Sequence, residues 1–401
     1  MRCLISKTVA RVSSSCSAGS LHEIELLRCG AEFFPALLSA IDQAGSEVML
    51  ETYIFAVDEI AHRVLESLAS AAARGVKVFL ITDWVGTGSE RSQQLRSFLQ
   101  RTGVQHRVFN RWFLRGATRT HRKLCVVDRR IAFVGGINIM HDLAATHSHA
   151  CLSSPRWDLS VRIQGPIVEA IHQEAQTQWR RIGHMHPLER LWMFALRARG
   201  TALTTATPQR RGEAVFLASD HLHHRMAIQR EYLRAIGLAR QTLLLVTPYF
   251  APGRTFRDAL TDAAGRGVKV TLLLGVGQFT LQDWVARSYY RKLLGSGVAL
   301  VEYRKSQLHA KVAVIDGQWA TVGSSNCDGL SLFVNHEANV VVHETAFAGI
   351  LEQEVQRAIA DGTSVNAAEF ADLNWSRRLL YGGAFLVYRG LMRLVTLNAY
   401  G

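Results

Sequence analysis

The 401-residue sequence lacks several features that would place it in a specialised class of protein. It has only seven prolines and is 48% hydrophobic, which argues against wholesale disorder and favours a packed globular chain. Its six cysteines form no C-x-x-C pair and no regular spacing, so neither a disulfide framework nor a zinc site is indicated. Cys125 and Cys327 lie in or beside apolar strand-like runs, where buried thiols in a reducing compartment are the simplest interpretation.

The N-terminal segment lacks a long apolar run. Within residues 1–20 the apolar positions are interrupted by Lys7 and Arg11, which makes the segment a poor signal peptide and too short to span a bilayer. Its role is unassigned.

Acidic residues are comparatively scarce. The chain has 33 of them against 46 lysines and arginines, a net charge of +13, which favours an anionic partner. Nucleic acid, anionic lipid and a phosphorylated substrate all satisfy this condition, and charge alone does not choose among them.

The pentapeptide RGVKV occurs twice, at 74–78 and 266–270, which are 266 − 74 = 192 positions apart. Each copy follows a strand-like run and an amphipathic helical stretch, and each leads into a β-branched run that predicts another strand. Gly75 and Gly267 stand just past the helical stretch, where a left-handed helix C-cap favours glycine. The chain therefore looks like two copies of one α/β unit.

A longer motif repeats in the same order. HRKLCVVDRRIAFVGGIN at 121–138 and HAKVAVIDGQWATVGSSN at 309–326 both read H-x-K-x4-D, a turn, and an apolar strand that ends in small residues and Asn; the offset is 309 − 121 = 188. This period is too long for a solenoid and predicts duplication. We expect α/β halves at 21–185 and 213–362, joined by a basic and apolar connector at 186–212.

The motif spacing suits a phosphate. Residues i and i+2 of a strand share a face, so His121 lies beside Lys123, and His309 beside Lys311. Asn138 and Asn326 follow small residues, which let an amide approach an oxyanion. Asp128 and Asp316 are grouped with the catalytic residues of the motif. Their odd interval from the histidines nevertheless predicts the opposite face, and with it support of the fold or pairing with a basic side chain.

These residues resemble the signature of the phospholipase D superfamily, His-x-Lys-x4-Asp followed by Gly-Gly/Ser-x-Asn, which is present twice per active site. The segments LETYIF, AAARGVKV, VRIQGPIVE and NHEANVVV are more specifically similar to bacterial cardiolipin synthases of the short type B. The resemblance implies a duplicated phospholipase D-like α/β fold, with two mixed-sheet halves packed with pseudo-twofold symmetry around one active site. It also implies that no metal or organic cofactor is needed.

The resemblance further implies roles for individual residues. His121 attacks phosphorus to give a phosphohistidine, His309 protonates the leaving alcohol, and the two imidazoles must then differ in pKa. Lys123, Lys311, Asn138 and Asn326 hold the phosphate oxygens. A carboxylate downstream of each histidine orients it, which assigns Glu337 to the second half and Asp158 to the first. A metal site in the histidine-rich stretches 141–149 and 221–225 is disfavoured, because neither stretch is repeated.

The last acidic residue is Asp372, and residues 373–401 carry four arginines among large apolar residues. On a helix, Arg378, Arg389 and Arg393 form one basic stripe, with Gly382 and Thr396 on the same line. The stripe predicts a C-terminal helix at a membrane interface, and a buried helix packed on the domain is the alternative. The mixed basic and apolar stretches at 111–120 and 187–200 suit an anionic bilayer surface, and also nucleic acid.

The favoured interpretation is a peripheral enzyme on the cytoplasmic side of the cell membrane that makes cardiolipin from phosphatidylglycerol. Its partners would be phosphatidylglycerol, other anionic phospholipids and the membrane surface, with no nucleic acid and no obligate protein partner. One alternative is a hydrolase of the same family, either phospholipase or nuclease, in which water resolves the intermediate. The other is a non-catalytic protein that binds lipid or nucleic acid.

Overall fold

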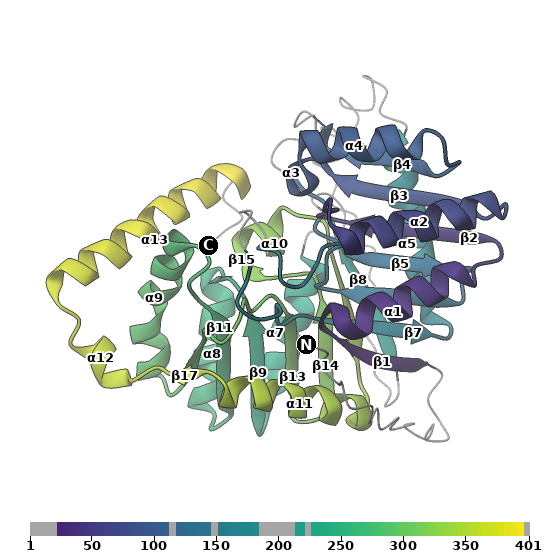
Figure 1. The fold of residues 1–401 in the computed structure, drawn as a ribbon. Helices are drawn as coiled ribbons and strands as arrows, with labels where there is room; N and C mark the ends of the chain where they lie inside the picture. Colours follow the sequence, from purple (N-terminus) through teal and green to yellow (C-terminus); the bar gives the residue numbers. More distant parts are fainter. Residues whose placement is uncertain (1–21, 112–117, 146–150, 184–212, 221–225, 397–401) are drawn as a thin grey trace, which may run out of the picture.

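The fold is described from a computed structural model, in which residues 22–111, 118–145, 151–183, 213–220 and 226–396 are described. It consists of two α/β halves that lie side by side (Figure 1). The first half contains a seven-stranded mixed sheet and the second an eight-stranded mixed sheet. The expected boundaries of the halves stay predictions, and the connector and residues 1–20 fall outside the described residues.

The sheet of the first half has the strand order β1-β7-β6-β5-β2-β3-β4. Its strands are β1 (Glu23–Arg28), β2 (Glu47–Thr52), β3 (Lys77–Asp83), β4 (Gln105–Phe109), β5 (Leu124–Val127), β6 (Ile131–Gly135) and β7 (Leu159–Gln164). Its helices are α1 (Cys29–Asp42), α2 (Glu59–Ala73), α3 (Trp84–Thr87), α4 (Ser89–Leu99) and α5 (Ile167–Gly183).

The sheet of the second half has the order β17-β12-β11-β9-β13-β14-β16-β8. Its strands are β8 (Ala214–Ser219), β9 (Thr242–Thr247), β11 (Lys269–Gly275), β12 (Ala299–Tyr303), β13 (Lys311–Ile315), β14 (Trp319–Gly323), β16 (Glu337–Val342) and β17 (Thr363–Ser364), and β10 (Phe250–Ala251) pairs separately with β15 (Cys327–Asp328). Its helices are α7 (Ala227–Leu238), α8 (Arg254–Gly265), α9 (Thr280–Gly295), α10 (Gly329–Phe333), α11 (Thr345–Ala360), α12 (Ala367–Ala371) and α13 (Trp375–Thr396).

The two strand orders match position by position, and the second half has one additional edge strand, β17. In both sheets the H-x-K motif leads into a strand, β5 or β13, that forms an antiparallel hairpin with the next strand, β6 or β14. On its other side this strand pairs antiparallel with β2 or β9. This agreement confirms the predicted duplication and the predicted fold class.

The expected glycine C-caps are also present. Gly75 has φ of 92° after α2 and Gly267 has φ of 89° after α8, the left-handed region that other residues rarely adopt. In each case the amide of the following valine donates to a carbonyl of the last helical turn, which ends the helix and starts the next strand.

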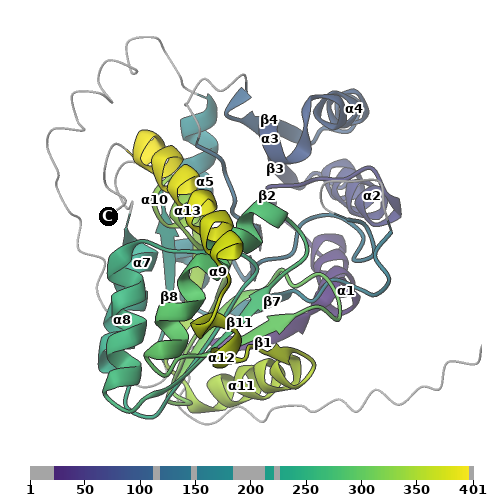
Figure 2. The ribbon, with the colours of Figure 1, turned by 90° about the vertical axis from the view of Figure 1, so that its left-hand side faces the viewer.

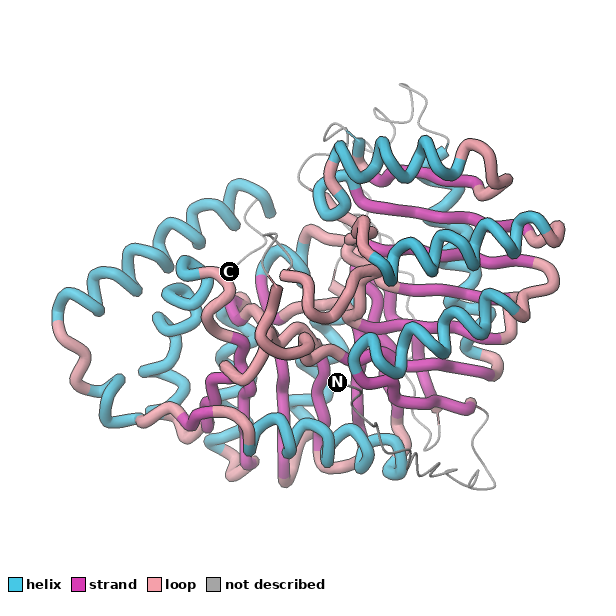
Figure 3. Tube along the Cα trace, in the orientation of Figure 1, coloured by secondary structure: helices cyan, strands magenta, loops and turns pink. Residues whose placement is uncertain are grey.

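The core has three parts. One cluster lies between the first sheet and its outer helices, and another between the second sheet and its outer helices. A third cluster lies between the two sheets and contains residues of both halves, including Met49, Val126 and Val161 with Val246, Val312 and Val340. The inward-facing residues of α5 and α11 belong to this central cluster. The halves therefore share one apolar interface, and the loops between them gather in the middle of the molecule (Figure 3).

Helix α13 packs on the second half, along α9 and against α10 (Figure 2). Tyr381, Ala384 and Met392 are buried in this contact, while Arg378 and Arg389 are exposed. The predicted basic stripe therefore faces solvent, but the segment is not a separate appendage, because Ala384 and Met392 belong to the second-half core. No helix in the described part of the chain is both long enough and apolar enough to cross a bilayer.

Candidate active site

The site lies where the backbones of the two halves pair with each other. Thr120 forms a parallel bridge with His336, and Trp157 forms the same kind of bridge with Leu308. Each bridge joins the residue before a motif histidine to the residue before a carboxylate of the other half. The amide of the histidine itself completes the contact: the His121 amide donates to the His336 carbonyl at 2.9 Å, and the His309 amide donates to the Trp157 carbonyl at 2.8 Å. The two halves thus make reciprocal contacts, as a pseudo-twofold arrangement requires.

These bridges bring each histidine to a carboxylate of the opposite half. His121 Nδ1 lies 3.1 Å from Glu337 Oε2 and 3.1 Å from the carbonyl oxygen of Ser324. His309 Nδ1 lies 2.6 Å from Asp158 Oδ2. The expectation that each carboxylate orients the histidine upstream in its own half is therefore wrong, although the carboxylates themselves were identified from the sequence.

The carboxylates fix the imidazoles in one tautomer. Glu337 and Asp158 are fully buried acceptors, and for each carboxylate the adjoining histidine and lysine lower the pKa despite burial. A carboxylate acceptor at Nδ1 favours a proton on that nitrogen and leaves Nε2 for chemistry. Both histidines therefore present the same ring nitrogen to the site.

Burial lowers the pKa of both imidazoles. For His121 desolvation outweighs the attraction of Glu337, and the pKa falls to about 4. For His309 desolvation and the neighbouring Lys311 lower the pKa well below its usual value. Both shifts favour the neutral imidazole. The expected difference between one neutral and one charged imidazole during the reaction stays a prediction.

The two lysines are buried beside the histidines, as the i, i+2 spacing predicts. Lys123 Nζ donates to the carbonyl oxygen of His121 at 2.6 Å, and Lys311 Nζ donates in the same way to His309. Burial lowers the pKa of Lys311 to about 8 and lowers that of Lys123 well below its usual value. Burial thus disfavours the charged ammonium form, and the negative charge of a bound anion would favour it, so the two lysines form a favourable environment for an anion.

The two asparagines are also buried, but their amide groups differ. Asn138 Oδ1 accepts from the Ile54 amide at 3.0 Å, which holds this side chain on the loop after β2. Asn326 Oδ1 is buried without a recorded hydrogen bond. Both lie directly after the strands that pair with the motif strands, so the structure places them at the same end of the sheets as the lysines.

Asp128 and Asp316 lie at the opposite ends of β5 and β13 from the histidines. Asp128 accepts from the amides of residues 45–47, and Asp316 accepts from the amides of residues 240–242. Both have positive φ, 51° and 53°, in the turn of the motif hairpin. They hold the loop before the neighbouring strand, so their grouping with the catalytic residues is corrected. The expectation that they support the fold is confirmed, with backbone amides rather than basic side chains as partners. The odd-interval argument does not apply, because both residues lie in the turn beyond the regular strand.

Several residues that support the site were not found from the sequence. Ser324 Oγ donates to Glu337 Oε2 at 2.5 Å, whereas its counterpart Gly136 packs so closely on Asp158 that a Cβ atom would lie 2.1 Å from that carboxylate. The half with GGIN therefore pairs its glycine with Asp158, and the half with GSSN pairs its serine with Glu337. This joint difference between the two repeats was the signal in the sequence for a contact between the two positions.

Arg122 is the second such residue. It stands between His121 and Lys123 and is fully buried, with its guanidinium 2.9 Å from Glu174 of α5 and donating to the Ser219 carbonyl of β8 at 3.1 Å. It therefore ties the first motif to both halves. The available signal in the sequence was the position of Arg122 between His121 and Lys123, which the alternation of a strand places on the face away from the site.

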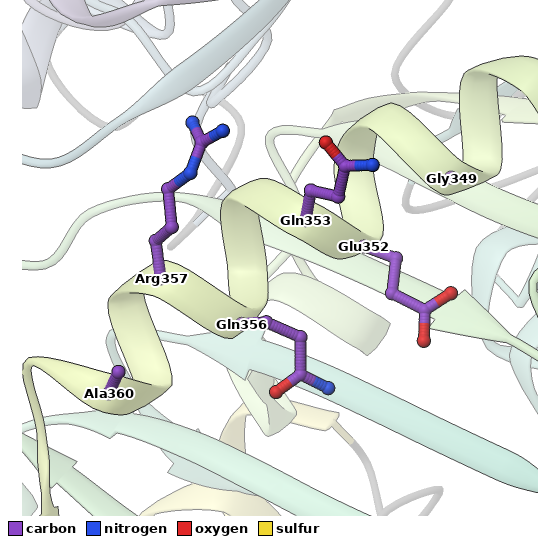
Figure 4. A pocket seen from close by; sticks show the side chains of 6 residues that line it. All are labelled: Gly349, Glu352, Gln353, Gln356, Arg357 and Ala360. Carbon is purple, nitrogen blue, oxygen red and sulfur yellow. The ribbon is translucent and has the colours of Figure 1, made fainter.

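Two hollows in the described surface are distinct from the histidine pair. One, about 550 Å³, lies on the outer side of α11 and is lined by Glu352, Gln353 and Arg357 among others (Figure 4). The other, about 580 Å³, borders the loop after Asn138 and includes Ala56, Met140 and His141 in its lining. No cluster of three or more potential metal ligands occurs among the described residues; the stretches 146–150 and 221–225 lie outside them.

The chain matches the family model described as "Cardiolipin synthase, PLD-like domain" at residues 37–178 and 232–359. It is 36% identical over 354 residues to cardiolipin synthase B of Escherichia coli (strain K12), over 86% of this chain and 82% of that protein. It is 35% identical over 347 residues to cardiolipin synthase B of Salmonella typhi, over 85% of this chain and 81% of that protein.

The fold is similar to the crystal structure of phosphatidylserine synthase from Haemophilus influenzae Rd KW20, with a TM-score of 0.68, 14% identity, and coverage of 93% of this chain and 95% of that one. The duplicated topology, the paired motifs and the extent of the sequence matches all support the same family. The chain belongs to the family of cardiolipin synthases with a phospholipase D-like domain.

Proposed function

We propose that the protein makes cardiolipin from two molecules of phosphatidylglycerol, with release of glycerol, through a phosphohistidine. The observation that carries the proposal is the reciprocal pairing of His121 with Glu337 and of His309 with Asp158, which orients two imidazoles in one site. Membership of the cardiolipin synthase family supports transfer as the reaction and phosphatidylglycerol as the substrate.

In the first step His121 Nε2 attacks the phosphorus of phosphatidylglycerol. The P–N bond forms as the bond from phosphorus to the glycerol oxygen breaks, and His309 gives its proton to that oxygen. The neutral state of His121 suits a nucleophile, because a protonated imidazole has no free electron pair.

The substrate itself supplies the charge that His309 needs as an acid. Its phosphodiester brings a negative charge into a buried site, and a nearby negative charge raises the pKa of an imidazole. His309 has its carboxylate partner at 2.6 Å, while His121 shares its Nδ1 between Glu337 and a carbonyl oxygen. The shorter contact favours the imidazolium on His309, and with it the acid role.

In the second step the headgroup hydroxyl of another phosphatidylglycerol attacks the phosphohistidine. His309 takes the hydroxyl proton, the P–N bond breaks and His121 leaves as neutral imidazole. Lys123, Lys311 and the amides of Asn138 and Asn326 stabilise the phosphate oxygens in both transition states. The cycle returns both histidines to their starting protonation states.

We place the reaction at the cytoplasmic side of the cell membrane, with peripheral attachment. The thiols of Cys125 and Cys327 are free in the structure, which agrees with a reducing compartment. The net charge of +13 favours contact with anionic lipid.

Incubation with headgroup-labelled phosphatidylglycerol tests the reaction. Transfer yields cardiolipin and one glycerol per cardiolipin, whereas hydrolysis yields phosphatidic acid and glycerol. Cardiolipin as the main product is expected with wild-type protein and none with His121→Ala. Phosphatidic acid as the main product would identify a phospholipase, and cleavage of DNA without action on lipid would identify a nuclease.

A further inference from the structure

The exposed apolar side chains of the protein are concentrated on one helix. Eleven large hydrophobic side chains are exposed in the described part of the chain, and six of them belong to the 22 residues of α13. These six are Trp375, Leu379, Leu380, Leu386, Val387 and Leu391, with exposed fractions from 41% to 76%. Exposed apolar groups are ordinary when scattered, but such a concentration marks an interaction surface.

This exposed apolar surface is not the face by which α13 packs on the protein. Tyr381, Ala384 and Met392 are buried against the second half, and Phe385 and Tyr388 pack beside them. Leu379 and Leu386 are seven residues apart and therefore share a side of the helix, about 160° from the side of Tyr381 and Tyr388 at 100° per residue. Helix α13, which packs on α9 (Figure 2), thus has two apolar faces, one buried and one exposed.

The charges beside the exposed face are all positive. Arg377, Arg378, Arg389 and Arg393 are exposed, and no acidic residue follows Asp372 in the sequence. Within the described residues, none of the four arginines takes part in a recorded ion pair. An apolar face bordered by unpaired arginines is complementary to an anionic lipid surface, where leucine side chains enter the acyl boundary and guanidinium groups meet phosphates.

We propose that α13 docks the protein on an anionic bilayer, lying in the plane of the interface with Trp375, Leu379, Leu386 and Val387 toward the acyl chains. The arginines preclude a spanning position, because Arg389 and Arg393 would stand in the hydrocarbon. The proposal deepens the proposed function by naming the surface through which the enzyme meets lipid.

The packed face of α13 connects this surface to the site. The Tyr388 hydroxyl accepts from the Gly329 amide at 3.0 Å and lies 3.5 Å from the Ala251 carbonyl, so it contacts β10 and the first residue of α10, which directly follows β15. Strand β15, which pairs with β10, begins directly after Asn326. The docking helix is therefore attached to the loop that carries one of the phosphate-binding residues, and docking fixes the site relative to the bilayer.

The test is binding of the full-length protein to vesicles of phosphatidylglycerol and phosphatidylcholine, measured by co-sedimentation. The double variant Leu379→Ser/Leu386→Ser removes apolar groups from the exposed face without touching the packed face. We expect the apparent affinity for vesicles to fall about tenfold or more. Leu238→Ser is the matched control, because Leu238 is 63% exposed at the end of α7, and it should leave binding unchanged.

A second arm tests the arginines. Arg378→Ala/Arg389→Ala should weaken binding to these vesicles and reduce its salt dependence, while Arg63→Ala, an exposed position on α2 of the other half, should do neither. Wild-type affinity for vesicles in both double variants would overturn the proposal. So would a dimer in lipid-free solution that the leucine variant converts to monomer, because a second copy would then be the occupant.

Activity on a short-chain, water-soluble phosphatidylglycerol separates the two proposals. Both double variants should turn it over at the wild-type rate, because they touch no residue of the site. If wild-type protein binds vesicles through α13 but makes no cardiolipin from either substrate, the proposed function fails and the docking surface stands. If cardiolipin forms but the leucine variant binds vesicles normally, the docking surface fails.

Discussion

The crossed pairs make a prediction that the sequence repeat alone would not. Asp158 lies in the first half but contacts His309, so Asp158→Asn should impair the acid and base work of His309 and spare the nucleophile. Two unit charges about 4 Å apart interact by about 4 kcal/mol at an effective dielectric constant of 20. Loss of that interaction with the imidazolium corresponds to a fall in kcat of about a thousandfold.

The assay compares two substrates. Phosphatidylglycerol needs a proton on its leaving glycerol, whereas a phosphodiester of 4-nitrophenol has a leaving group that departs without one. Asp158→Asn and His309→Ala should therefore lose about a thousandfold in turnover of phosphatidylglycerol but less than about tenfold in the first release of nitrophenolate. Glu337→Gln and His121→Ala should lose both activities, because they affect the nucleophile.

The pattern across the four variants decides the matter. If Asp158→Asn behaves like His121→Ala, the crossed pairing is wrong. If the pairs behave alike but the activated substrate rescues Glu337→Gln and not Asp158→Asn, the crossing stands and His309 is the nucleophile. Asp142→Asn is the control for loss of a nearby carboxylate, since Asp142 accepts from the Gly30 amide and contacts neither histidine; it should retain both activities.

Other consequences are open to measurement. Asp128→Asn should lower the free energy of unfolding by about 1 to 2 kcal/mol, discounted for partial exposure, and leave kcat within about twofold, because backbone amides hold the pKa of this carboxyl at about 2; a large loss of kcat in a folded variant would restore it to the catalytic residues. Burial holds the pKa of His121 at about 4, so between pH 6.5 and 4 the unfolded chain binds a proton that the folded chain does not. The free energy of unfolding should therefore fall by on the order of 3 kcal/mol as the pH falls through that window, and urea titrations of His121→Gln at several pH values should lack this part of the pH dependence. Tyr388→Phe should lower kcat on soluble and bilayer substrate alike while vesicle binding stays normal, and unchanged kcat would remove the link between α13 and the site. EDTA should leave activity intact, and a loss restored by one divalent ion would contradict the mechanism.

The sequence predicted the features that repeat. The H-x-K motif, the glycine after the helix (Gly75 and Gly267) and the apolar strand-like runs each appear twice, and the two copies occupy matching positions in the two sheets. The carboxylates Asp158 and Glu337 were recognisable through the family resemblance, which implies a carboxylate downstream of each histidine. What the sequence could not provide was the partner of each carboxylate, because pairing depends on how the halves pack and the distance along the chain contains no such information.

The pKa values and the C-terminal helix show the same limit. Separate pKa values for the two histidines follow from the reaction, but the lowering of both pKa values in the structure comes mainly from burial, which the two histidines share. The helical spacing predicted the arginine stripe of α13. The sequence pattern of an apolar helix face is nevertheless the same whether that face packs on protein or is exposed to solvent. Only the packing on α9 divided it into a buried face with Met392 and an exposed one with Leu386.

The central cluster between the two sheets also bears on how the chain is synthesised. Residues of the first half such as Met49, Val126 and Val161 share a core cluster with residues of the second half, such as Val312 and Val340, that leave the ribosome 151 to 291 residues later. The outer core of the first half can form as soon as its own strands and helices are complete. The apolar inner face of its sheet stays exposed to water until the second half emerges, so a chain truncated near the connector should aggregate. Because both halves share this cluster, the full-length protein should unfold in a single cooperative transition.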